Sequence, residues 1–243
     1  MLFRSVQITY ARVLAIEPNE IIWKEKKPIL GKEASMLLLR IGAIRFGEFT
    51  LSSRRKSPYY IDLRLAPSYP DVLDRIGDLY VDVIKNEIQP KWKIDRIAGV
   101  PTAGLPVATV VSQKLRVPLI YVRKEKKDYG LSKTVEGVVE SNDNILLVDD
   151  LITTGHSTIQ EAEILRETGN VKHVVVLVDR EQGGPENLSH EELELHSLIK
   201  ITNVFAYLKD LDAIPPKTYE SVMNYVKASE QNTPETLKLA SSK

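Results

Sequence analysis

The chain has 243 residues, with 33 Lys and Arg against 33 Asp and Glu, four His and no Cys. This length suits one large domain or two small ones, and the absence of Cys excludes disulfides, thiolate nucleophiles and Cys-ligated metal centres. The formal net charge is zero, which argues against binding of nucleic acid or anionic lipid over the whole surface of the protein. A local basic site is compatible with zero net charge.

Residues 1–31 are interpreted as an N-terminal extension of unknown role. Arg4 and Arg12 precede the first acid, Glu17, which faintly resembles a transit peptide, but a variable arm or an over-extended start is the favoured interpretation. No apolar run approaches the roughly 20 residues that span a bilayer. We therefore expect a cytoplasmic protein without a membrane segment.

A regular pattern begins at Lys32. Apolar residues then recur at helical spacing and predict an amphipathic helix that ends near Gly47. Residues 59–63 (YYIDL) have the composition of a strand. Residues 69–88 again predict a helix, because their apolar side chains fall on one face.

Four short apolar runs follow and predict strands at 94–100, 117–122, 144–148 and 173–178. Helix-length segments lie at 104–115, 155–167 and 217–227. Runs that are apolar almost throughout, such as ILLV and VVVLV, are typical of a parallel sheet covered on both faces. The pattern predicts an α/β doubly wound fold, in which ligands bind beyond the carboxyl ends of the strands. Residues 229–243 are interpreted as a polar tail.

The most informative segment is ILLVDDLITTGHST at 145–158, where a buried strand leads into two carboxylates and a turn that begins a helix. Backbone N–H groups at a helix N-terminus, with Thr and Ser hydroxyls beside them, bind phosphate, and Gly155 permits close approach of the backbone. Asp149 and Asp150 would repel phosphate, so their partners are sugar hydroxyls or a cation. The segment suits a ribose 5-phosphate. The alternatives are a Thr or Ser helix cap and a receiver-type acidic pocket.

VDDLITTGHST resembles the phosphoribosyl-diphosphate signature of the type I phosphoribosyltransferases. Residues 46–64 (FGEFTLSSRRKSPYYIDLR) and 121–130 (YVRKEKKDYG) are similar to the N-terminal signature and the mobile catalytic loop of the orotate phosphoribosyltransferases. The three matches follow the order of the family. The resemblance implies a phosphoribosyltransferase domain over 32–228 with a small N-terminal hood. It implies binding of the phosphoribosyl diphosphate by Asp149, Asp150, Leu151, Ile152, Thr153, Thr154, Gly155, His156 and Ser157.

Residues 123–133 carry five positive and two negative side chains. Loss of diphosphate from the ribose builds negative charge on the leaving group, which cations stabilise. By resemblance, Arg123, Lys124 and Lys127 contact the diphosphate, and Lys127 is assigned as catalytic together with Asp149 and Asp150. The alternative is a solvated charged loop.

Two further segments follow predicted strands. Residues 99–104 (GVPTAG) resemble the diphosphate loop of the family, although a simple strand–helix connection fits this segment nearly as well. Arg180 follows VVVLV and matches the family position that holds the orotate carboxylate, which a planar guanidinium binds bidentately. Thr153 matches a second orotate contact. Tyr60 is a candidate for stacking on the pyrimidine, against the more common role of a half-buried strand aromatic.

The chain departs from the family pattern at several positions, among them Arg54, which replaces a glycine. Ser52 and Ala103 stand where the family usually has Lys, and Tyr129 stands where it has His. These departures bear on rate and diphosphate affinity more than on fold. The four histidines have no metal-ligand spacing, so no protein metal site is predicted.

The resemblance implies an orotate phosphoribosyltransferase that uses Mg²⁺ bound to its substrate and forms a homodimer with shared active sites. Its partners are orotate and phosphoribosyl diphosphate, without nucleic acid or membrane. Two alternatives remain open: a phosphoribosyltransferase for a purine or uracil, and a non-catalytic sensor of phosphoribosyl diphosphate that regulates transcription. Arg180 disfavours the first, since a neutral base has no carboxylate, and the lack of a convincing DNA-binding element disfavours the second.

Overall fold

The computed structural model describes residues 18–50, 56–123 and 134–231. Lys124 and Lys127, which are predicted diphosphate contacts, lie outside these residues, as do Ser52 and Tyr129. Within the described part of the chain, no helix is both long and apolar enough to cross a bilayer.

The first described helix, α2 (Pro18–Arg40), differs from the prediction at both ends. It begins inside the segment interpreted as an extension and crosses residue 31 without a break, and Trp23 and Leu30 are buried in the main core. It stops well before Gly47, because Gly42 takes a left-handed conformation (φ 69°). The amides of Gly42 and Ala43 donate to the carbonyls of Leu39 and Leu38, the pattern of a Schellman motif.

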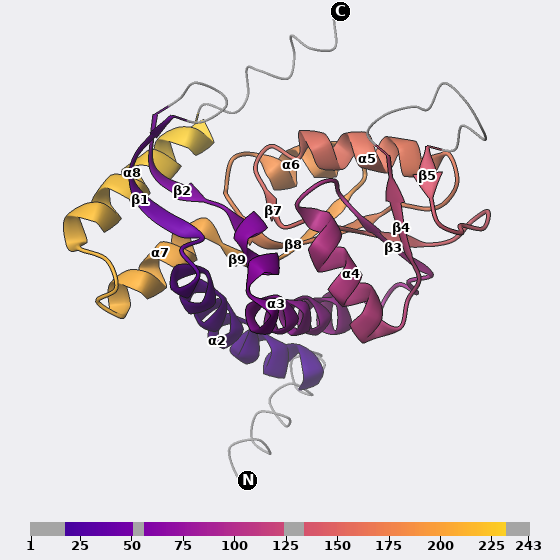
Figure 1. The fold of residues 1–243 in the computed structure, drawn as a ribbon, viewed down its shortest axis with the longest axis horizontal. Helices are drawn as coiled ribbons and strands as arrows, with labels where there is room; N and C mark the ends of the chain where they lie inside the picture. Colours follow the sequence, from indigo (N-terminus) through magenta and orange to yellow (C-terminus); the bar gives the residue numbers. More distant parts are fainter. Residues whose placement is uncertain (1–17, 51–55, 124–133, 232–243) are drawn as a thin grey trace, which may run out of the picture.

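A two-stranded antiparallel hairpin follows, formed by β1 (Ile44–Thr50) and β2 (Lys56–Ile61). Only β2 overlaps a predicted strand, and β1 was assigned to the end of the preceding helix. A 3-10 helix, η1 (Leu63–Ser68), leads from the hairpin to the next helix. The buried ring of Tyr59 packs edge-on against Phe205 and Tyr225, at centroid distances of 4.9 and 5.9 Å. The hairpin is thus held by the two C-terminal helices, as Figure 1 shows.

The central sheet is mainly parallel, as predicted, and among its described strands only β5 runs antiparallel to its neighbour, β4. The strands lie in the order β5 (Val135–Glu136), β4 (Leu119–Val122), β3 (Arg96–Gly99), β6 (Ile145–Val148), β8 (His173–Asp179) and β9 (Glu194–Lys200), with β7 (Leu151–Ile152) also paired to β8. All four predicted apolar runs contain a strand of this sheet. The sequence interpretation missed β5, β7 and β9.

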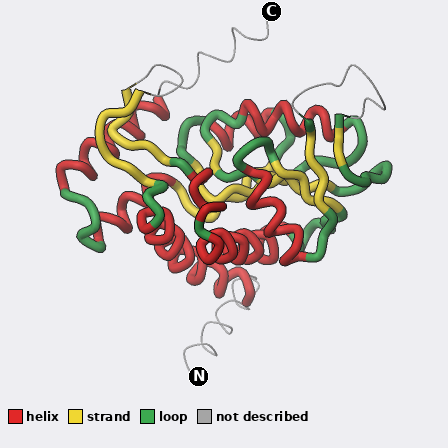
Figure 2. The backbone as a smooth tube through the Cα atoms, viewed as in Figure 1, coloured by secondary structure: helices red, strands yellow, loops and turns green. Residues whose placement is uncertain are grey.

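Helices cover both faces of the sheet, which lies between them in Figure 2. One core cluster joins the sheet to α2, α3 (Pro70–Val83), its π-helical extension η2 (Ile84–Ile88) and α4 (Gly104–Leu115). The other joins it to α5 (His156–Arg166) and α6 (Gly184–His190). Successive residues of β6 belong alternately to the two clusters, so both faces of this strand are buried. That double burial explains why ILLV is apolar throughout.

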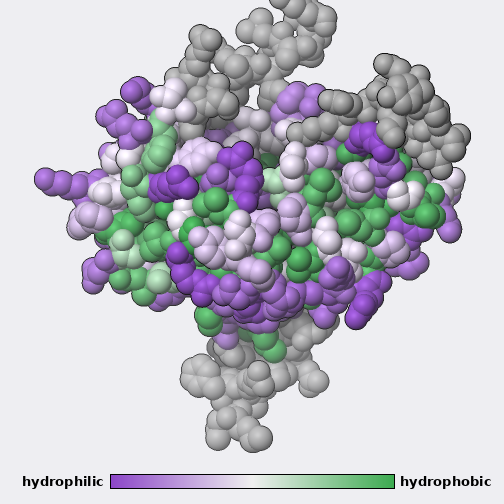
Figure 3. Space-filling view, in the orientation of Figure 1, coloured by the Kyte–Doolittle hydropathy of each residue, from purple (hydrophilic) through white to green (hydrophobic). Residues whose placement is uncertain are grey.

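The predicted helices at 69–88, 104–115 and 155–167 are confirmed by α3 with η2, by α4 and by α5. The C-terminal prediction corresponds to α8 (Pro216–Gln231), while α6 and α7 (Ile201–Asp210) were missed. On the face drawn in Figure 3, hydrophilic residues line the edge over α2 and α3, and apolar residues occur between them in smaller groups.

Candidate active site

The two adjacent carboxylates lie at an interruption between β6 and β7. Both short strands pair with β8 in the same register, and only Asp149 and Asp150 separate them. Backbone hydrogen bonds continue through the gap, since the Asp149 amide donates to Val175 and the Leu177 amide donates to Asp150. The acids are therefore fixed to the centre of the sheet.

Both acid side chains are buried and bond locally. Asp149 Oδ1 accepts from the amide of Asp150 at 2.9 Å, and Asp150 Oδ1 accepts from the amide of Leu151 at 2.9 Å. Burial raises the pKa of both carboxyl groups, and the charge of Asp150 adds to the effect on Asp149. Within the described residues neither carboxylate makes an ion pair. A ligand that donates hydrogen bonds or carries a cation would therefore stabilise the ionised pair.

Tyr80 on α3 holds the backbone of the same interruption. Its buried hydroxyl donates to the carbonyl oxygens of Asp149 at 2.6 Å and Asp150 at 3.3 Å. Burial raises the pKa of Tyr80 well above its ordinary value, so the phenol stays a donor. Nothing in the sequence pattern had singled out this residue, because only the packing of α3 against the sheet brings its hydroxyl to the two carbonyls.

The turn after β7 leads into α5 without a side-chain cap. The N-cap residue is Gly155, at φ 81°, and no side chain accepts from the first amides of the helix in the described structure. The Thr or Ser cap considered as an alternative is therefore not present. Asn187 of α6 donates to the Thr154 carbonyl at 2.8 Å and holds the turn from outside. Free N–H groups at a helix N-terminus, aided by the helix dipole, form an anion site.

The 99–104 loop lies directly against the acid pair. A Cβ on Gly104 would stand 2.7 Å from the Val148 carbonyl and 3.0 Å from Asp149 Cα, so only glycine permits this approach. α4 begins here with Ala103 as its N-cap, again without a side-chain cap among the described residues. The N-termini of α4 and α5 thus meet beside the two carboxylates.

One cavity of about 250 Å³ unites these features. It is lined by Val100, Pro101, Thr102, Ala103, Asp149, Asp150, Leu151, Ile152, Thr153, Thr154, Gly155, His156, Ser157 and Thr158. Every predicted ribose-phosphate residue from Asp149 to Ser157 is in this set. The cavity combines two helix N-termini with a pair of carboxylates, which is suited to a ligand that carries both phosphate and hydroxyl groups.

Arg180 lies beside this cavity at the carboxyl end of β8. Its amide donates to the Ile152 carbonyl at 3.0 Å, which ties it to the same turn. Its guanidinium lies 5.3 Å from the centroid of the Tyr59 ring, and Nη2 donates to the Tyr59 hydroxyl at 3.4 Å. The buried Nε has no hydrogen-bond partner in the described structure. An anionic group reaching this position would satisfy it.

The aromatic beside Arg180 is Tyr59, and Tyr60, the predicted candidate for stacking on the pyrimidine, lies elsewhere. Successive strand residues face opposite ways, so Tyr60 packs near Phe49, with centroids 5.6 Å apart, and accepts from Arg64 at 2.9 Å. Arg123, the described diphosphate candidate, is ion-paired with Glu136 across β4 and β5.

The described residues contain one group suited to a metal ion, formed by His173, Glu194 and His196. The sequence interpretation found no such spacing, because it is the pairing of β8 with β9 that brings these residues together. The group lies at the amino ends of these strands and is not part of the cavity.

Comparison with known proteins agrees with the geometry. Residues 68–207 match the model of the phosphoribosyl transferase domain family. The chain is 40% identical to the orotate phosphoribosyltransferase of Methanocaldococcus jannaschii over 166 residues, which cover 68% of this chain and 91% of that protein. It is 37% identical to the bovine (Bos taurus) uridine 5'-monophosphate synthase over 190 residues, which cover 78% of this chain but only 39% of the bovine protein. The crystal structure of orotate phosphoribosyltransferase from Aeropyrum pernix superposes with a TM-score of 0.64 at 32% identity, covering 74% of this chain and 99% of that one.

Proposed function

This chain belongs to the orotate phosphoribosyltransferases of the phosphoribosyl transferase family, and we propose that its cavity binds phosphoribosyl diphosphate and transfers the phosphoribosyl group to orotate. In this reaction orotate N1 forms a bond to C1 of the ribose and diphosphate leaves with the electron pair of the broken C1–O bond. The product, orotidine 5'-phosphate, is a precursor of UMP. The chain spans about two fifths of the bovine synthase, so no further activity of that protein is assigned to it.

The observation that carries the proposal is the meeting of two uncapped helix N-termini with a buried carboxylate pair in one cavity. We assign the 5-phosphate to the turn from Thr153 to Ser157, the ribose hydroxyls to Asp149 and Asp150, and the diphosphate side to the 99–104 loop. Hydroxyl donors would satisfy carboxylates whose pKa values burial has raised, and the helix N-termini would hold the anions.

Arg180 is assigned to the orotate carboxylate and Thr153 to a second contact with the base. The buried Nε of Arg180, unpartnered among the described residues, and its neighbour Tyr59 favour a planar anionic base. A neutral purine or uracil would leave the guanidinium without a counter-charge, which argues against salvage of those bases. Tyr60 is retained as a proposed stacking residue, although its ring packs near Phe49 and its hydroxyl accepts from Arg64.

The proposed diphosphate contacts also include Arg123, Lys124 and Lys127. Cations near the leaving group would stabilise the negative charge that develops on it. Arg123 is the described member of this group, and its pairing with Glu136 would have to open for it to take part.

Mg²⁺ is proposed to enter with the substrate. Carboxylate oxygens such as those of Asp149 and Asp150 are ligands that Mg²⁺ prefers, and a positive charge beside this buried pair would favour its ionised form. Most of its ligands would be diphosphate, sugar and water oxygens. The ion would supply neutralisation of the diphosphate charge. We also propose a cytoplasmic homodimer in which the basic segment of one subunit serves the site of the other.

The test is a spectrophotometric assay of orotate consumption by the purified full chain, with phosphoribosyl diphosphate and Mg²⁺. We expect loss of the orotate absorbance together with release of diphosphate in equal amounts. Parallel reactions receive uracil or a purine in place of orotate. Turnover of one of those bases without turnover of orotate would refute the proposed acceptor, and donor binding without any turnover would favour the sensor.

A further inference from the structure

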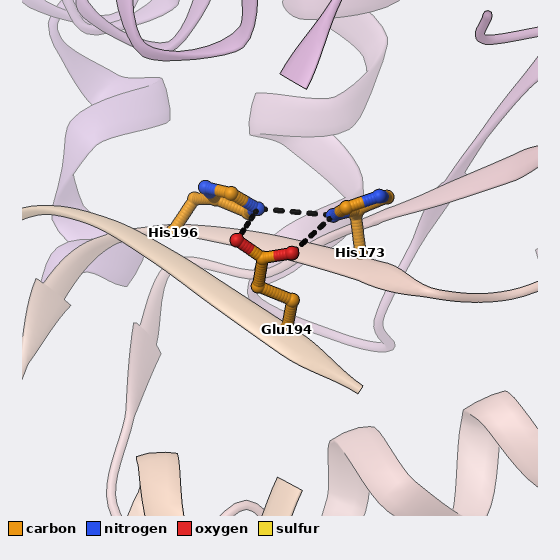
Figure 4. Close-up of side chains that lie close together, drawn as sticks. All are labelled: His173, Glu194 and His196. Atoms are coloured by element: carbon orange, nitrogen blue, oxygen red, sulfur yellow. Dashed lines mark hydrogen bonds and ion pairs between the residues drawn. The ribbon is translucent and has the colours of Figure 1, made fainter. Parts of the chain in front are cut away.

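A second constellation of polar side chains lies at the amino ends of β8 and β9, away from the cavity. His173 pairs in register with Glu194, and His196 follows two residues later on the same face of β9. Figure 4 shows the three side chains converging on one point. His173 and His196 are largely buried, with side-chain exposures of 13% and 5%, while Glu194 is open to solvent.

The distances within this triad approach those of a coordination sphere. His173 Nδ1 and His196 Nε2 are 3.0 Å apart, and each lies 3.6 Å from a different oxygen of Glu194. Two ligand atoms that each lie about 2.0–2.2 Å from a tetrahedral ion are separated by about 3.3–3.6 Å. The distances from the Glu194 oxygens to the two imidazole nitrogens already reach this value. The two imidazole nitrogens, which are 3.0 Å apart, need to separate by only a few tenths of an ångström.

His196 has the outer partner that metal-binding histidines usually have. Its Nδ1 lies 3.1 Å from Glu87 Oε2 on η2. Trp23 Nε1 and Lys27 Nζ donate to Glu87 Oε1 at 2.8 and 2.6 Å, which leaves Glu87 Oε2 to accept from the Nδ1–H of His196. The Nε2 lone pair then points into the triad. A carboxylate that fixes the tautomer and orients the ring in this way strengthens metal binding.

We propose that His173, Glu194 and His196 bind a divalent transition metal ion of the Zn²⁺ class. Two imidazole nitrogens and one carboxylate suit Zn²⁺, Co²⁺ or Ni²⁺, whereas Mg²⁺ prefers oxygen ligands. The exposed side of Glu194 leaves the fourth position to water. This site is distinct from the proposed substrate-borne Mg²⁺, because it lies at the amino ends of β8 and β9 and shares no residue with the lining of the cavity.

The ion would act on stability. It would join β9, which lies at the edge of the sheet, to its neighbour β8. Through Glu87 it would also join η2 and α2, since Glu87 accepts hydrogen bonds from Trp23 and Lys27 of α2. Binding to the folded state alone raises the unfolding temperature with metal concentration. We expect this effect without a change in orotate turnover.

The experiment is titration of the metal-free full chain with Zn²⁺ by calorimetry and with Co²⁺ by visible spectroscopy, without phosphoribosyl diphosphate. We expect one ion per chain, a Co²⁺ d–d band of tetrahedral intensity, and no displacement by excess Mg²⁺. His173→Ala and Glu194→Ala should each weaken binding at least tenfold. Glu87→Gln should weaken it by about tenfold, because the outer partner is altered.

His190→Ala is the matched control, since this histidine is exposed on α6 and outside the triad. It should bind like the unaltered chain, and so should Asp149→Asn. Glu194→Ala changes an exposed side chain, so its unfolding temperature without metal should stay normal. Absence of binding to the unaltered chain would overturn the proposal. Equal affinity for Zn²⁺ in His173→Ala, Glu194→Ala and His190→Ala would also overturn the proposal. The contact between His173 and His196 would then be a hydrogen bond without a metal-binding role.

Discussion

Carboxylates at the two ends of the central sheet, a buried pair at one end and the partly buried Glu87 at the other, have opposite electrostatic surroundings. At the carboxyl end, Asp149 and Asp150 lie side by side, accept hydrogen bonds from backbone amides and have pKa values that burial raises. At the amino end, Glu87 accepts from Trp23 at 2.8 Å, Lys27 at 2.6 Å and His196 at 3.1 Å, and its pKa falls to about 2.

This difference indicates that the pair Asp149 and Asp150 suits the binding of a ligand, whereas Glu87 connects elements of the fold. The charge of Glu87 is compensated by the protein itself, so its ionisation stabilises the folded state. The charges of the acid pair are poorly compensated until a ligand arrives, so their ionisation costs stability in the empty protein. Functional sites commonly carry such a cost. Changes at the carboxyl end should therefore affect activity, and changes at the amino end should affect stability.

The largest effect is expected for Lys127→Ala, a change in the basic segment assigned to the active site. Loss of a cation that stabilises the leaving diphosphate should lower kcat by about 10²–10³-fold. The unfolding temperature should not change. Steady-state kinetics measures kcat and a thermal melt measures the unfolding temperature. A near-normal kcat would contradict the proposed catalytic role of Lys127.

Acid should destabilise the protein through Glu87. Its folded pKa of about 2 lies below the ordinary 4.5, so its contribution is present above about pH 4.5 and is lost as the pH falls toward 2. The full shift corresponds to roughly 3–4 kcal/mol, and the contribution is smaller than this because Glu87 is partly exposed and solvent screens its charge. Urea unfolding at about pH 6 and about pH 3 should show a larger loss in the unaltered chain than in Glu87→Gln. Equal losses would contradict the assigned role, and orotate turnover at neutral pH should be the same in both.

Arg180→Ala should change the KM values of the two substrates by different amounts. Loss of a charged hydrogen-bonding partner costs about 2 kcal/mol or more, so the KM for orotate should rise by roughly 30-fold or more. The KM for phosphoribosyl diphosphate should change little, because its assigned contacts lie in the turn and loop. Equal increases in both values would place Arg180 outside the orotate pocket.

Gly155→Ala tests how tightly the phosphate turn is packed against α6. A Cβ at this position would meet Leu188 Cδ1 at 2.2 Å in addition to the strain of φ 81°. Gly42→Ala is the matched control, since φ is 69° there and no atom lies within 4 Å. The control should lose about 1 kcal/mol of unfolding free energy from strain alone, and Gly155→Ala should lose a further 1–2 kcal/mol from overpacking. Equal losses in denaturant would show that the turn tolerates a side chain.

Asp149→Asn should give a smaller effect of opposite sign on stability. Its folded pKa is raised, so the ionised carboxylate disfavours folding above the unfolded pKa, and a neutral amide that still accepts from the Asp150 amide removes that cost. We expect the unfolding temperature to rise by a few degrees at about pH 7, with the difference vanishing at low pH. Affinity for phosphoribosyl diphosphate should fall about tenfold by calorimetry. A lower unfolding temperature would contradict the contrast between the two sheet ends.

Contiguous features were predictable from the sequence. The segment from Ile145 to Thr158 carries strand, acids, turn and helix start in one stretch, and the cavity contains the predicted residues Asp149 to Ser157. The apolar runs predicted the parallel sheet, because strands buried on both faces need apolar residues at every position. Helix boundaries were less predictable at α2, because the apolar pattern continues past Gly42 while the backbone reverses there.

Only the tertiary structure decided which distant residues meet. Alternation along β2 leaves Tyr59 beside Arg180 and directs Tyr60 elsewhere, and the short strand β7 depends on the register of β8. His173, Glu194 and His196 show no metal-binding spacing in the sequence, since parallel pairing joins residues that a whole helix and its loops separate. The sequence by itself determined the fold class and the contiguous strand, acid pair and turn that line the cavity, because local pattern and chain order specify both. The triad and its link to Glu87 exist only through long-range packing.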